Sequence, residues 1–359
     1  MKITRNIKIS FNRILMPFPI LFIFALLLLS PEVSLDYMKY SLELCAKSLV
    51  PSLFPFMVIS DFLIASNFGG IIKSLISKIT GFVFGTSHDG SFAVVLGLLC
   101  GFPVGAKSAL RLYKQNKISH AELCHIMSFC NIPSPAFMCG TVAMMFQSRE
   151  LGTLLFFSLV LSSVIIGVIG RTIYKYERKS TSSFAEHTDV AAAFTTSVTS
   201  SALVMICVCA YVVFFSVLIG YSRHLCELFG ARDTLPLILS GLLEISNGMS
   251  CAAGADTEIA PLIAAFFAGF SGLSVIFQIF SLDTSRSIRK KAFVLQKLLQ
   301  GGLCSLIMFF ALKICPVSLN PLTETMNKIS FESYGLYIGI LFFISASLPI
   351  LATLGQKKR

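Results

Sequence analysis

The chain has 359 residues, of which 55% are hydrophobic and 13% are charged, and its formal net charge is +11. A soluble domain has too little interior to bury this much apolar surface, so the composition predicts an all-α polytopic membrane protein. The basic residues cluster between apolar runs, which is typical of cytoplasmic loops and argues against a nucleic-acid-binding protein.

The expected elements are ten apolar runs, each long enough to enter or cross a bilayer. The first, 14–30, is interpreted as a retained helix, because no small-residue cleavage site follows it. The remaining runs are 48–68, 82–105, 121–146, 151–170, 194–220, 234–254, 258–280, 292–314 and 334–354.

Lys and Arg residues set the expected orientation. Basic clusters lie at the N-terminus, at 107–117, 171–179 and 286–291, and in the C-terminal tail. All of them, and both termini, are expected in the cytoplasm. Run 82–105 then begins and ends on the cytoplasmic side, so it is predicted to be a re-entrant hairpin, and 234–254 must be a hairpin from the opposite side.

This arrangement predicts about eight crossings and two hairpins, in two oppositely oriented repeats. The first gate-like repeat would cover 41–171 and the second 194–315, joined by a cytoplasmic linker, 172–193. An N-terminal membrane helix within 1–40, and a C-terminal helix and basic tail within 316–359, lie outside the repeats. Inverted repeats with broken helices are typical of secondary transporters.

Four polar stretches interrupt the apolar runs. They are "GFPVGAK" (101–107), "CNIPSP" (130–135), "EISNG" (244–248) and the segment from 269 to 278. Irregular backbone is tolerated at membrane depth only where protein or water surrounds it, so these stretches predict a central polar cavity. The predicted helix breaks are Gly101, Pro103, Gly105, Pro133, Pro135, Gly248, Gly269 and Gly272.

Half-helix ends present amide donors to anions and carbonyl oxygens to cations. The predicted substrate-binding residues are Phe102, Lys107, Asn131, Ser134, Glu244, Asn247, Ser271, Ser274 and Gln278. Each polar residue among them has an alternative role, which is to hold neighbouring helices together.

Three ionisable residues within apolar runs have open roles. Asp61 either lies at the cytoplasmic boundary or is functional. Lys107 either extends to the interface or faces the substrate. Glu244 would pair with Lys107, couple a proton or cation, or cap a broken helix.

Catalytic and metal-binding patterns are missing from the sequence. The 11 cysteines form no C-x-x-C pair, and we interpret them as apolar fillers. His120 and His125 flank Glu122 at a spacing that does not fit the H-E-x-x-H zinc motif. No phosphate loop, nucleophile elbow or dinucleotide fingerprint occurs. We therefore expect no enzyme activity, no metal and no cofactor.

Taken together, "PSLFPFMVISDFLI", "GLLCGFPVGAKSALRL", "SFCNIPSPAFMCGTV", "GLLEISNG" and "AGFSGLSVIFQ" resemble the YlbJ family of sporulation integral membrane proteins, also called stage V sporulation protein V. The resemblance covers about 40–350 and includes a gate or nucleoside-recognition domain. The motif residues are Gly101, Phe102, Pro103, Gly105, Ala106 and Lys107, then Asn131 and Pro135, then Leu243, Glu244, Asn247 and Gly248.

The resemblance implies a mother-cell membrane protein of an endospore-forming bacterium, required for cortex formation, that moves dipicolinic acid across the outer forespore membrane. Dipicolinate is a small flat dianion, which helix amino ends and Lys107 would suit, with Phe102 or Phe129 stacked on its ring. One alternative is a nucleoside or other small-solute transporter of the gate type. Another is a scaffold for cortex assembly that transports nothing. The expected partners are the anion, the lipid bilayer and a possible second copy of the chain.

Overall fold

The computed structural model describes residues 17–66, 70–176, 189–231 and 234–317, and these residues form helices and connecting segments without a strand. The predicted all-α class is therefore confirmed for the described residues. The predicted run 334–354, and most of the predicted linker 172–193, lie outside them.

The first half of the described chain runs from α2 to α10. Its elements are α2 (Pro17–Leu29), α3 (Pro31–Leu44), the π-helix η1 (Cys45–Leu49), α4 (Val50–Ala65), α5 (Gly70–Val83), α6 (His88–Cys100), α7 (Val104–Lys114), α8 (His120–Phe129), the π-helix η2 (Ala136–Val142), α9 (Ala143–Met145) and α10 (Arg149–Ile173).

The second half begins with the longest helix. Its elements are α11 (Val190–Leu228), α12 (Thr234–Leu243), α13 (Ile245–Ala253), α14 (Ala260–Phe270), α15 (Gly272–Leu282) and α16 (Lys290–Ile314).

Five helical segments of the described chain are long and apolar enough to cross a membrane: Pro31–Ala65, Arg149–Ile173, Val190–Leu228, Ala260–Leu282 and Lys290–Ile314. A sixth is possible if Ile76–Val83 and His88–Cys100, which meet at 88°, count as one broken span. The described residues therefore support a multi-pass membrane protein. Among the predicted crossings that they cover in full, 121–146 is not one of these five segments, because its helices are short and interrupted at 130–135.

The first long segment begins at Pro31, well before the predicted start at residue 48. Charged residues such as Asp36 and Lys39 make 31–47 resemble a loop in the sequence. Proline is compatible with the first turn of a helix, however, and the helix continues through η1 into α4. The predicted boundary at residue 40 falls inside this continuous helix.

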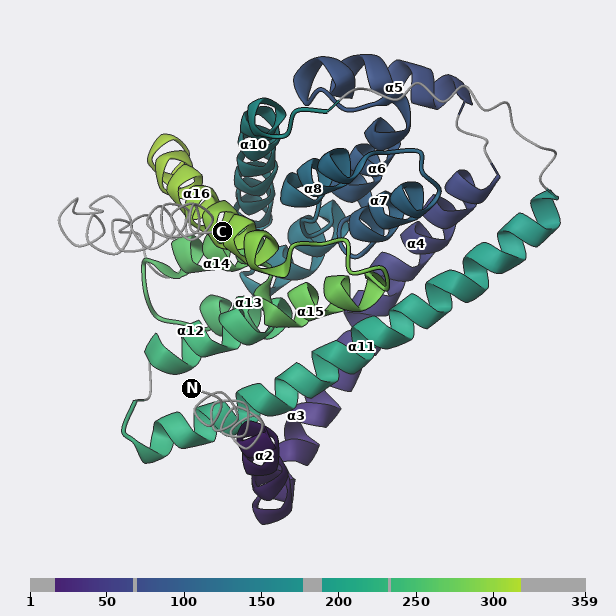
Figure 1. Ribbon diagram of the computed structural model, residues 1–359. Helices are drawn as coiled ribbons and strands as arrows, with labels where there is room; N and C mark the ends of the chain where they lie inside the picture. Colours follow the sequence, from purple (N-terminus) through teal and green to yellow (C-terminus); the bar gives the residue numbers. More distant parts are fainter. Residues whose placement is uncertain (1–16, 67–69, 177–188, 232–233, 318–359) are drawn as a thin grey trace, which may run out of the picture.

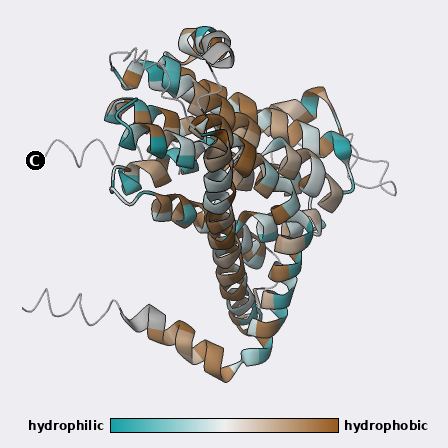
Figure 2. Cartoon of the chain, turned by 90° about the vertical axis from the view of Figure 1, so that its right-hand side faces the viewer, coloured by the Kyte–Doolittle hydropathy of each residue, from teal (hydrophilic) through white to brown (hydrophobic). Residues whose placement is uncertain are grey.

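The α3–α4 segment and α11 lie side by side as the two longest rods of the molecule (Figure 1). Large apolar side chains of α11, among them Leu203 and Ile206, are exposed. Figure 2 shows apolar residues predominating along the long helix that faces the viewer. An exposed apolar surface of this extent fits contact with lipid rather than with water.

Two helix pairs fold back on themselves, and in both the helices are in close contact. An added Cβ on Gly105 of α7 would lie 2.6 Å from the Cα of Gly97 in α6. An added Cβ on Gly248 of α13 would lie 2.2 Å from the Cα of Gly241 in α12. Only glycine permits backbones to approach this closely. Three predicted breaks, Gly105, Gly248 and Gly269, are therefore wrong: each lies inside a helix and serves close packing.

Several basic segments meet at one end of the molecule. Lys114 Nζ, at the end of α7, donates to Thr284 Oγ1 over 2.8 Å. Gln296 Nε2, near the start of α16, donates to the hydroxyl of Tyr174, which follows α10, over 2.6 Å. The described parts of the predicted basic clusters at 107–117 and 171–179 thus each contact the segment 284–296, which contains the cluster at 286–291.

Candidate functional site

The connection between α6 and α7 packs against the irregular segment 130–135 that follows α8. The amide of Phe102 donates to the carbonyl oxygen of Ile132 over 2.9 Å. Gly101 has a φ of 75°, and a Cβ there would lie 2.5 Å from the amide nitrogen of Ser134. The predicted breaks at Gly101, Pro103, Pro133 and Pro135 all fall in these two connections between helices.

The connection between α12 and α13 is made by Glu244, whose carboxylate caps α13. It accepts hydrogen bonds from the amides of Ser246 (3.0 Å) and Asn247 (2.8 Å). A Cβ on Gly272, where α15 begins, would lie 3.1 Å from the amide nitrogen of Ile245. This fold-back connection therefore also packs against the break in the helix that follows it.

A small cavity lies where these four connections meet. Its polar lining residues are Ser134, Glu244, Ser246 and Gln278. Its apolar lining comes from both halves of the chain, including the two long helices. The apolar lining residues are Leu49, Leu53, Phe102, Pro133, Phe137, Val208, Val212, Ile245 and Val275. The space open to a water-sized sphere is ≈ 20 Å³. This is room for about one water molecule, so a solute the size of dipicolinate does not fit the cavity in this conformation.

Of the predicted substrate-binding residues, Phe102, Ser134, Glu244 and Gln278 line this central cavity. Gln278 is buried; its Nε2 donates to Ser274 Oγ over 3.2 Å, and its Oε1 has no hydrogen-bond partner among the described residues. Buried polar atoms are normally hydrogen-bonded, so this acceptor fits a water molecule or another donor in the cavity.

The other predicted binding residues do not line the cavity. Asn247 Nδ2 donates to Glu244 Oε2 and to Ser216 Oγ, both over 2.8 Å. Ser271 has a φ of 71° and shapes the turn between α14 and α15. Phe129, the candidate stacking ring, is fully buried against Phe84.

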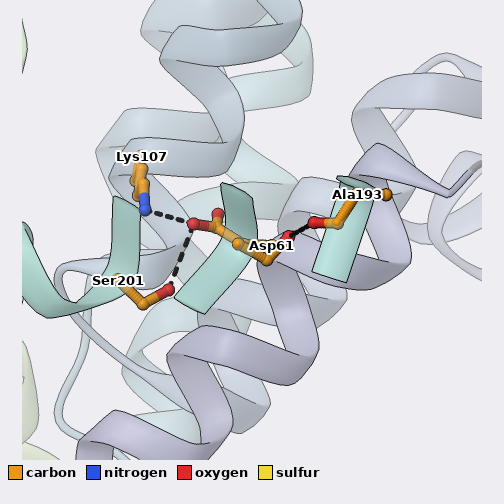
Figure 3. A network of polar contacts seen from close by, with 5 residues as sticks. Asp61, Lys107, Ala193 and Ser201 are labelled. Carbon is orange, nitrogen blue, oxygen red and sulfur yellow. Dashed lines mark hydrogen bonds and ion pairs between the residues drawn. The ribbon is translucent and has the colours of Figure 1, made fainter. Parts of the chain in front are cut away.

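Lys107 lies in an ion pair outside the cavity. Its Nζ donates to the carboxylate of Asp61 in α4, and Ser201 Oγ of α11 donates to the same oxygen over 3.2 Å (Figure 3). The Asp61 side chain is 4% exposed and that of Lys107 is 16% exposed. Lys107 therefore pairs with Asp61 and not with Glu244, and of the roles predicted for Glu244 the structure shows the helix cap.

Sequence reasoning missed Lys297, which is 1% exposed in α16. Its Nζ donates to the carbonyl oxygen of Asn131 over 2.6 Å and to Gln300 Oε1 over 2.8 Å. Gln300 Nε2 in turn donates to Ser163 Oγ of α10 over 2.8 Å. The signal was present in the sequence, because a lysine two turns beyond the basic start of α16 is an ionisable group at membrane depth.

The two histidines flanking Glu122 have separate partners. His125 Nε2 contacts the carbonyl oxygen of Gly167 and its Nδ1 contacts the Tyr176 hydroxyl, at 2.8 and 2.9 Å. His120 Nε2 contacts the carbonyl oxygen of Ser287 at 2.8 Å. Among the described residues, no three His, Cys, Asp or Glu side chains are grouped to hold a metal ion.

The chain is 29% identical to the sporulation integral membrane protein YlbJ of Bacillus subtilis (strain 168), over 81% of its own length and 80% of the length of that protein. No protein-family model matches the chain, and no solved structure matches it either. An alignment of this length includes both fold-back pairs and both broken helices. This similarity over most of both chains supports the resemblance to the YlbJ family of sporulation integral membrane proteins.

Proposed function

We propose that this chain is a sporulation membrane transporter that moves a small organic anion, dipicolinate, across the outer forespore membrane, as cortex formation requires. The observation that carries the proposal is the meeting of two fold-back connections and two helix breaks around one cavity. Interrupted helices that meet in this way are how transporters present polar groups to a solute within the membrane.

The contacts in the two halves support the inverted repeats. In each half a long helix, a fold-back pair, a broken helix and a single long helix occur in this order, and in the first half α5 lies between the long helix and the fold-back pair. The glycine pair Gly97 and Gly105 in the first half corresponds to Gly241 and Gly248 in the second. We propose that both fold-back pairs are re-entrant hairpins, entering from opposite sides, and that the basic end faces the cytoplasm.

The cavity size fits a closed state of the proposed transporter. A space for about one water molecule cannot carry dipicolinate, so transport requires the connections to separate. The direct contact between the amide of Phe102 and the carbonyl of Ile132 would be one of those that change. Alternating access to a closed central site is the general behaviour of repeat-built transporters.

Transport is tested with purified protein in vesicles that contain trapped terbium ions. Dipicolinate added outside would enter and make the terbium luminesce, and we expect saturable entry above that of protein-free vesicles. Gln278→Leu should slow entry at least about tenfold, because it removes a polar group from the cavity. Gln115→Leu makes the same change at an exposed site outside the cavity and should have no effect.

Failure of the folded wild type to admit dipicolinate would refute the proposal. Entry of labelled uridine in the same vesicles would instead support the alternative of a nucleoside transporter. A scaffold for cortex assembly predicts tolerance of substitutions such as Gln278→Leu in sporulating cells, together with sensitivity in the segment 172–193.

A further inference from the structure

A second and larger cavity lies at the basic end of the molecule, between the first turns of α8 and α16. Its volume is ≈ 170 Å³, against ≈ 20 Å³ for the central cavity. We call it the basic pocket, and its chemically important lining residues are His120, Cys124, Tyr174, Arg289, Phe293 and Gln296.

The charge at the basic pocket is positive. Arg289 is the charged lining residue, and it precedes α16, whose N-terminus has no side-chain cap. The amides of an uncapped first turn favour an anion, as does the guanidinium of arginine. Asp283 is nearby, but its carboxylate already accepts hydrogen bonds from the amides of Ser287 (3.0 Å) and Ile288 (2.7 Å).

The other lining groups suit a flat ring. Phe293 and Tyr174 supply aromatic surface, and Gln296 holds the Tyr174 hydroxyl by a hydrogen bond of 2.6 Å. Burial raises the pKa of the Tyr174 phenol above its ordinary value. Tyr174 therefore stays neutral at physiological pH and does not repel an anion.

One hydrogen bond joins residues next to the basic pocket and residues next to the central cavity. Lys297 directly follows the lining residue Gln296, and its Nζ donates to the carbonyl oxygen of Asn131 over 2.6 Å. Asn131 belongs to the irregular segment whose Ser134 lines the central cavity. Lys297 thus joins the helix that lines the basic pocket to the break at 130–135.

We propose that the basic pocket is the site where the organic anion first binds from the basic face of the protein, with Arg289 pairing with a carboxylate and Tyr174 and Phe293 contacting the ring. This inference rests on the proposed transport of an aromatic dicarboxylate. It assigns a loading site that is separate from the closed central cavity.

The test is calorimetric titration of dipicolinate into the purified full-length protein, combined with entry into vesicles. Arg289→Gln should weaken binding and raise the half-saturating concentration by roughly tenfold or more, because it removes a charge-assisted pair. Lys291→Gln removes the same charge two residues away, at an exposed site outside the pocket, and should change binding less than about twofold.

A second variant tests the shape of the basic pocket without changing its charge. Ala292→Phe fills the basic pocket while leaving every charge in place, and it should also weaken dipicolinate binding. If wild type transports dipicolinate but Arg289→Gln and Ala292→Phe bind it as tightly as wild type does, the loading site is refuted and the proposed function stands. If the folded wild type neither binds nor transports dipicolinate, both are refuted.

Discussion

The two broken helices differ in how the backbone groups at their breaks are satisfied. The break after α8 covers six residues, 130–135, contains two prolines, and has a carbonyl oxygen that accepts a hydrogen bond from Lys297. The break between α14 and α15 is a tight turn, in which Ser271 and Gly272 have φ values of 71° and 78°. Backbone groups freed within a membrane protein can therefore be satisfied by a buried cation or avoided by a compact turn.

The connections within the two fold-back pairs also differ in the contacts that hold them. The tip between α6 and α7 uses a backbone hydrogen bond from Phe102 to the neighbouring break. The tip at Glu244 instead carries its own carboxylate, which caps α13. The connection in the first half is thus held by a hydrogen bond between segments, whereas the connection in the second half has a local cap in addition to its packing against Gly272.

The largest expected effect tests the close approach within each fold-back pair. Gly248→Ala should lower the unfolding free energy by about 3 kcal/mol, because the added Cβ would lie 2.2 Å from the Cα of Gly241. Gly105→Ala should cost less, about 2 kcal/mol, since the corresponding distance to Gly97 is 2.6 Å. Thermal unfolding in detergent measures both changes.

Gly140→Ala is the matched control, because nothing lies within 4 Å of a Cβ at that position. It should leave the unfolding temperature unchanged or slightly higher. Equal and small effects at Gly248 and Gly105 would show that neither fold-back pair is as closely packed as the structure describes.

The second prediction concerns the cap at Glu244. Glu244→Ala should lower the unfolding free energy by about 2 kcal/mol, because the amides of Ser246 and Asn247 lose their acceptor in a buried site. Glu244→Gln keeps one acceptor oxygen and should cost about half as much. A larger loss for Gln than for Ala, measured by thermal unfolding, would argue that Glu244 does more than cap α13.

Lys297 is expected to matter more for transport than for stability. Lys297→Met removes a costly buried amine but leaves the Asn131 carbonyl and Gln300 Oε1 without their donor, so the net change in unfolding free energy should stay within about 1 kcal/mol. Dipicolinate entry should fall at least about tenfold, as measured by terbium luminescence. Lys291→Met, at an exposed site of the same helix, is the control. If Lys297→Met lowers the unfolding free energy by several kcal/mol while the remaining folded protein admits dipicolinate normally, Lys297 has a purely structural role.

Sequence patterns located the irregular backbone well, because proline removes a helical hydrogen bond and polar residues are costly within an apolar run. Gly101, Pro103, Pro133 and Pro135 all lie in connections between helices. Glycines were harder to interpret, since Gly105 and Gly248 serve helix contact within helices and no pattern in a single sequence separates the two uses.

The partners of buried charges could not be predicted from spacing along the chain. Lys107 meets Asp61, which is 46 residues away, and Lys297 meets Asn131, which is 166 residues away. The positive-inside pattern suggested that Lys107 belongs with the basic segments of the cytoplasmic side. Only the packing of α7 against α4 shows why this lysine turns to a buried carboxylate.

The smallest expected effect tests the compact turn between α14 and α15. Ser271 adopts a left-handed conformation that costs a residue with a Cβ about 1 kcal/mol, and glycine would remove most of that cost. Because glycine also gains freedom in the unfolded chain, Ser271→Gly should stabilise the protein by only about 0.5 kcal/mol. Ser274→Gly, at a helical position in α15, should instead destabilise it by about 1 kcal/mol. If both variants lower the unfolding temperature equally, the turn does not depend on backbone conformation, and the contrast between the two broken helices loses its physical basis.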